Sequence, residues 1–144
     1  MVRRLILPAI FIVVVLFCGV NTSYASDPPE YQLAIINAGG YVPNDHITVA
    51  RFRSLLNQLS STYGENQQRI ADMSAKSQDV LRKEGVEESL LKIMEGLNQL
   101  FPGSTANQKY SDCLSAYMAL RVKGASHSEA IQGIQAIFGS LGVK

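Results

Sequence analysis

The sequence predicts an all-α protein, a small helical domain of about five helices that follows an N-terminal signal peptide. Apolar residues recur at spacings of three and four along most of the chain, as they do on the buried face of a helix. No alternating apolar run is joined to another by hairpin turn residues, so no pair of strands is indicated. The first 25 residues are apolar and carry only two charges, unlike the rest of the chain.

The N-terminal segment has the three parts of a signal peptide. Two arginines supply the positive start, residues 5–20 form an almost uninterrupted apolar run, and residues 23–25 (Ser-Tyr-Ala) fit the small-x-small cleavage pattern. As a helix, the run would rise about 24 Å, which is short of the roughly 30 Å hydrocarbon core of a bilayer. We therefore expect cleavage between Ala25 and Ser26 and export to the periplasm or the medium. An uncleaved N-terminal anchor is the less favoured alternative.

Cleavage would leave one cysteine, Cys113, in the exported protein. Cys18 is a poor lipid-attachment site, because the bulky Phe17 adjoins the bond that a lipoprotein peptidase would cut. A solitary cysteine cannot form an internal disulfide. Cys113 shares a helix face with Tyr110 and Leu114, so we interpret it as a buried small residue, with an intermolecular disulfide in a homodimer as the alternative.

The exported body, residues 26–144, is close to neutral. It carries 11 Lys and Arg against 12 Asp and Glu. This balance gives no electrostatic reason to expect a nucleic acid, or a membrane beyond the export signal, as a partner. Its length is that of one domain. We therefore predict a single domain whose partner is another protein or a second copy of itself.

Two helical segments are expected in the first half of the body. A short helix should occupy residues 30–38, because two prolines precede it and two glycines follow it. Apolar residues then follow a 3-4 spacing from Val49 to Tyr63, and the same register continues beyond Gly64. We therefore favour one long helix over about 46–84, in which Gly64 would cost about 1 kcal/mol relative to alanine. A helix that ends at Gly64 and a second that returns is the alternative.

Three more helices are expected in the second half. Residues 86–101 place apolar side chains on one broad face, and residues 109–124 form the next helix. The last helix begins at a capping box, S-x-x-E, formed by Ser126 and Glu129. No second copy of the last helix pair occurs upstream, so no repeat architecture is indicated.

No catalytic or metal-binding pattern is recognisable in the body. Its two histidines, His46 and His127, are about 80 residues apart, and we expect both at helix N-termini, outside the apolar stripes. The carboxylates of Glu84, Glu87 and Glu88 are interpreted as a solvated first turn that the helix dipole favours. We therefore predict no enzymatic activity, no cofactor and no bound metal.

Two functions fit these observations. The first is a non-catalytic module of the envelope or the medium that binds another protein or itself. The alternative is a periplasmic carrier of a small apolar, lipid-like ligand, because amphipathic helices rich in Leu, Ile and Met can enclose an apolar cavity. The stretch 70–80, with its narrow apolar stripe, and the opening helix 30–38 are the candidate docking faces. The sequence does not separate the two functions, since cavity volume depends on packing.

Overall fold

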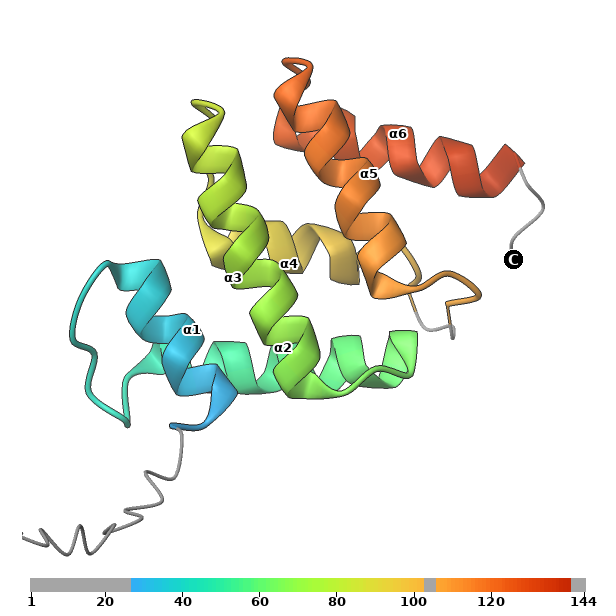
Figure 1. The fold of residues 1–144 in the computed structure, drawn as a ribbon. Helices are drawn as coiled ribbons and strands as arrows, with labels where there is room; N and C mark the ends of the chain where they lie inside the picture. Colours follow the sequence, from blue (N-terminus) through green and yellow to red (C-terminus); the bar gives the residue numbers. More distant parts are fainter. Residues whose placement is uncertain (1–26, 103–105, 141–144) are drawn as a thin grey trace, which may run out of the picture.

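Six helices make up the part of the chain that the structure, a computed structural model, describes: residues 27–102 and 106–140 (Figure 1). The helices are α1 (Pro29–Ala38), α2 (Ile47–Tyr63), α3 (Gln67–Lys83), α4 (Leu90–Asn98), α5 (Tyr110–Val122) and α6 (His127–Ser140). These residues contain no strand, and the predicted all-α class is confirmed. The expected signal peptide and its cleavage site, Ala25 and Ser26, lie outside the described residues.

The helices are arranged in two layers. In Figure 1, α1, α3 and α5 form one layer, and α2, α4 and α6 cross behind them. The packing follows the same plan, because α3 contacts both α1 and α5, while α4 contacts both α2 and α6. The chain thus stacks three successive helix pairs, as helical solenoids do. This arrangement was not expected, because the sequence contains no second copy of the last helix pair.

One apolar core fills the space between the two layers. Its largest fully buried side chains include Phe52, Leu56, Leu59, Ile70, Leu81, Leu90, Ile93, Met94, Leu97, Tyr110 and Tyr117. Tyr63 joins three helices within this core. Its ring packs edge to face on Tyr110 at 5.2 Å and on Phe101 at 5.8 Å, and its hydroxyl donates to the carbonyl of Leu97 at 2.9 Å.

The expected single helix over 46–84 is wrong, because the chain turns at Gly64. Gly64 has a φ of 65°, the left-handed conformation that ends many helices. Asn66 Oδ1 then accepts hydrogen bonds from the backbone N–H groups of Gln68 and Arg69, which starts α3. The continuous apolar register was misleading, because it ran through Met73 and Val80, which are only half-buried in α3, and the buried stripe overlaps it only in part. That stripe consists of Ile70, Ala71, Ser74, Ser77, Gln78 and Leu81.

The polar residues in this stripe have hydrogen-bond partners, which allows them to be buried. Ser74 and Ser77 each donate to the carbonyl four residues earlier, at 2.7 and 2.8 Å. Gln78 Nε2 donates to the carbonyl of Glu88 at 2.9 Å. The Ser74 hydroxyl also lies 2.7 Å from the hydroxyl of Tyr110. These bonds connect α3 to α5 and to the segment before α4.

Replacing Gly64 with alanine tests the break between α2 and α3. An added Cβ meets no atom within 4 Å, so the expected loss of about 1 kcal/mol in unfolding free energy comes from the left-handed backbone alone. In a continuous helix the same change would stabilise the protein by about 1 kcal/mol, because alanine is the better helix former. Urea unfolding followed by circular dichroism measures the sign. A more stable variant would contradict the turn at Gly64.

The helix that was expected over 86–101 is shorter in the structure. The N–H groups of Gly85 and Val86 close a Schellman motif after α3, so residues 86–89 form a linker. Ser89 then caps α4 through its side chain. Glu88 therefore lies in this linker rather than in the solvated first helical turn that we expected.

Two of the remaining helix ends follow the signals in the sequence, and the start of α5 does not. Gly39 ends α1 in the left-handed conformation, as expected. The capping box of α6 is confirmed, because the Ser126 N–H donates to Glu129 Oε2 at 2.7 Å and the Glu129 N–H donates to Ser126 Oγ at 3.3 Å. At the start of α5, Glu65, from the α2–α3 turn, accepts the Tyr110 N–H at 3.0 Å. This long-range cap was not expected from the sequence.

Candidate functional site

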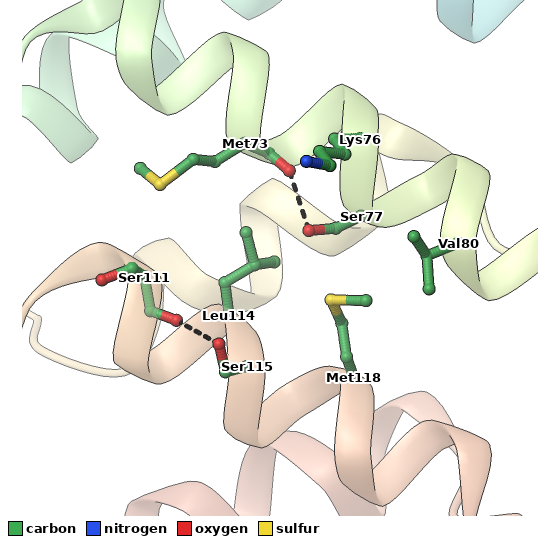
Figure 2. Close-up of a pocket in the computed structure, with 8 residues that line it drawn as sticks. All are labelled: Met73, Lys76, Ser77, Val80, Ser111, Leu114, Ser115 and Met118. Atoms are coloured by element: carbon green, nitrogen blue, oxygen red, sulfur yellow. Dashed lines mark hydrogen bonds between the residues drawn. The ribbon is translucent and has the colours of Figure 1, made fainter.

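An apolar groove of about 220 Å³ lies between α3 and α5 (Figure 2). It is lined by Met73, Lys76, Ser77 and Val80 of α3 and by Ser111, Leu114, Ser115 and Met118 of α5. Each helix therefore contributes residues over about two turns, at the spacing of one helix face. The α3 wall falls within the stretch 70–80 that the sequence indicated as a docking face. The α5 wall was not expected.

Carbon and sulfur atoms form most of the groove surface. Figure 2 shows Leu114 and Met118 extending from α5 toward α3. Leu114 is buried, at 3% exposure, whereas Met73, Val80 and Met118 are only half-buried. The methionine side chains are unbranched and polarisable, which lets them adapt to the shape of a partner. The groove is thus an apolar surface that the fold itself covers only in part.

The polar groups of the groove differ in how they are engaged. Ser77 Oγ donates to the carbonyl of Met73 at 2.8 Å, and Ser115 Oγ donates to that of Ser111 at 2.7 Å (Figure 2). Lys76 is exposed, and its ammonium group forms no ion pair with the described residues. The groove therefore presents apolar surface together with one positive charge.

A second cluster, the Glu88 cluster, lies where the α3–α4 linker meets α5 and α6. Glu88 Oε2 accepts a hydrogen bond from Arg121 Nη2 at 3.0 Å, and Lys92 Nζ lies 3.2 Å from Glu88 Oε1. The side chains of Glu88 and Arg121 are only 8% and 12% exposed. The interpretation of Glu88 as a solvated residue is therefore wrong, because its carboxylate is in a buried ion pair.

His127 belongs to the same cluster, although we expected it outside the apolar stripes and exposed. Its side chain is 17% exposed, and its Nδ1 lies 2.9 Å from the Tyr117 hydroxyl and 3.9 Å from Glu88 Oε2. Gly96 makes room for the ring, since a Cβ there would lie 2.7 Å from His127 Cε1. Burial lowers the pKa of His127, against an opposing effect of Glu88, and burial raises the pKa of Tyr117 to about 12. In the sequence, the one signal for the contact between α4 and His127 is Gly96, a glycine among the apolar residues of this helix.

The lowered pKa of His127 predicts a loss of stability in mild acid. The charged groups facing the ring are Glu88, Lys92, Glu95 and Arg121. Because the unfolded chain takes up a proton near pH 6.5 and the folded chain only below that, stability should fall as the pH drops from 6.5 through the folded pKa. Urea unfolding at pH 7.5 and 5.5 should show a larger decrease for the unmodified protein than for His127→Gln. Equal decreases would contradict the neutral, buried imidazole.

Cys113 and His46 lie apart from the groove lining. Cys113 is fully buried, as interpreted, and burial raises the pKa of its thiol to about 11. A thiol in this state is a poor nucleophile. His46 is exposed at the N-terminus of α2, where its Nδ1 accepts the Thr48 N–H at 3.2 Å. The hydrogen-bond partner of the His127 ring is the Tyr117 hydroxyl. Neither His46 nor His127 is therefore paired with the Cys113 thiol among the described residues.

The intermolecular disulfide through Cys113 stays a prediction, and burial makes it the less favoured one. The sulfur would have to leave the core before it could meet a second chain. We expect the purified protein, alkylated before denaturation, to run as a monomer on a non-reducing gel. A dimer band that disappears on reduction and in Cys113→Ser would contradict this expectation.

Within residues 27–102 and 106–140, no three or more His, Cys, Asp and Glu side chains are grouped in a way that could hold a metal ion. None of the helices in the same ranges combines the length and the apolar character needed to cross a bilayer.

Comparison with protein families matches residues 41–137, about two thirds of the chain, to the family described as MoxZ. The chain belongs to the MoxZ family. The MoxZ match starts in the loop after α1 and ends within α6, so it includes both walls of the groove and the Glu88 cluster. No curated protein and no solved structure matches this MoxZ-family chain.

Proposed function

We propose that this MoxZ-family protein is an exported, non-catalytic module that binds another protein through the groove between α3 and α5. The groove is the observation that carries the proposal. Its half-buried apolar side chains come from two helices and remain partly open to solvent. Partly exposed apolar side chains on two neighbouring helices can pack against a helix of a partner protein. The leader pattern in residues 1–25 supports export.

The arrangement of the helices also supports a protein partner. Stacked helix pairs commonly bind partners along the surface that one layer of helices presents. The groove lies between two neighbouring helices of one layer, α3 and α5. The MoxZ match supports a role in a system related to methanol oxidation, which narrows the search for the partner.

A carrier of a small apolar ligand is the second candidate, because the groove lining is mainly apolar. Its volume of about 220 Å³ argues against this candidate. Pockets that enclose small molecules usually span about 300–1,000 Å³ and cover most of the ligand. Mass spectrometry of an organic extract separates the candidates, since reproducibly co-purified lipid would support the carrier.

Two variants on α5 test the proposed function. Ser115 lines the groove, whereas Ala119 is also exposed on the same helix and does not line it. Ser115→Arg should abolish the crosslinked complex recovered from the native envelope, because the long side chain fills the groove. Ala119→Arg should leave the recovery unchanged, and circular dichroism should show the same helix content in both variants. Equal recovery with Ser115→Arg and the unmodified protein would overturn the proposal.

A further inference from the structure

We infer that the occupant of the groove is an amphipathic helix of a partner protein, with a carboxylate in its apolar stripe that pairs with Lys76. This inference rests on the proposed function and adds the chemistry of the partner. Two features of the groove carry it: the geometry of its walls and its single unpaired charge.

The geometry favours a helix over an extended peptide. The walls are the side chains of two α-helices, whose backbone N–H and C=O groups are already bonded within each helix. An extended segment would find no backbone partners there, whereas a helix satisfies its own.

The dimensions of the walls match the face of one helix. The α3 wall runs from Met73 to Val80 and the α5 wall from Ser111 to Met118, so each spans eight residues, with about 10 Å between its ends. A third helix packed between them would present side chains at i, i+3 or i+4, and i+7 over the same length. Small or methyl-bearing residues at these positions fit the half-buried thioethers of Met73 and Met118.

The charge favours an acidic partner. Lys76 forms no ion pair with the described residues, and the carboxylates near it on α3 are engaged elsewhere. Asp72 accepts from Gln68 at 2.8 Å, and Asp79 pairs with Lys83 at 2.7 Å. The Ser77 and Ser115 hydroxyls donate to backbone carbonyls. The Lys76 ammonium is therefore the one charged donor that the groove lining offers, and its complement is a carboxylate.

Selection from a displayed library of helical peptides against the purified exported protein tests the inference. We expect enriched peptides to combine an apolar stripe with Asp or Glu within it. Lys76→Glu should weaken binding of a selected acidic peptide about tenfold or more, and changing that peptide's carboxylate to Lys should restore binding to Lys76→Glu. The matched control is Lys123→Glu, the same charge change outside the groove lining, which should leave affinity unchanged.

The outcomes separate this inference from the proposed function. If the peptides bind Lys76→Glu as tightly as they bind the unmodified protein, but do not bind Ser115→Arg, the carboxylate pairing is overturned and the groove remains the binding site. Peptides that still bind Ser115→Arg, or the absence of any enriched peptide, would overturn the inference itself. Saturable binding of a fluorescent fatty acid, lost with Ser115→Arg, would replace the helix with a lipid-like occupant.

Discussion

Replacing Glu88 with alanine is expected to lower the free energy of unfolding by about 3–5 kcal/mol. The change leaves Arg121 without its carboxylate partner, although its side chain is only 12% exposed and its buried Nε has no hydrogen-bond partner. The Glu88 backbone carbonyl also accepts from Gln78, so a disturbed linker would loosen α3 as well. Urea unfolding followed by circular dichroism measures the loss.

Glu87→Ala is the matched control for this prediction. Glu87 is the adjacent residue, but its side chain is 81% exposed and lies 4.0 Å from Arg82. Exposed pairs of this kind contribute about 0–1 kcal/mol, so the control should change stability little. If Glu88→Ala fails to fold, Glu88→Gln keeps a hydrogen-bond acceptor and should give a smaller, measurable loss. Equal effects of Glu87→Ala and Glu88→Ala would contradict the buried ion pair.

The second large effect is expected at Tyr110, the fully buried first residue of α5. Tyr110→Ala should cost about 3–5 kcal/mol, because it removes the ring that packs edge to face on Tyr63 and leaves a cavity between α3 and α5. The measurement is again the free energy of unfolding in urea.

Tyr110→Phe provides the comparison, because it removes only the hydroxyl that lies 2.7 Å from Ser74 Oγ. Ser74 keeps its bond to the Ile70 carbonyl, so this change should cost only about 1 kcal/mol. The ring, rather than the hydroxyl, should therefore account for most of the loss. Equal costs for the two variants would contradict that division.

Local signals in the sequence predicted the helical class and most helix ends. The glycine after α1 and the capping box of α6 act through neighbouring residues, so they are readable without a structure. The break at Gly64 was misjudged, because a continued 3-4 register was given more weight than the glycine. The structure shows that α3 starts at its own Asn66 cap, and that its buried stripe includes Ser74, Gln78 and Leu81, which the expected register did not contain.

The candidate site was predictable only in part, because it depends on how distant segments pack. The α3 wall lies within a stretch that the sequence singled out for its narrow apolar stripe, but the choice of α5 as the opposite wall follows from the stacking of helix pairs. The pairing of Glu88 with Arg121 joins residues 33 positions apart. For the nearby His127, the only local hint was Gly96, whose missing side chain admits the His127 ring.

Site-specific photo-crosslinking in the native host tests most directly whether the groove between α3 and α5 is where this MoxZ-family protein meets its partner. A photoreactive amino acid would be placed at Ser115, inside the groove lining, or at Ala119, outside it on the same helix. The account predicts one discrete adduct from position 115 and none from position 119. Lys76→Glu should reduce the yield of this adduct, and the crosslinked segment of the partner should be an amphipathic helix. Identical adducts from both positions, or a discrete adduct only from position 119, would contradict it.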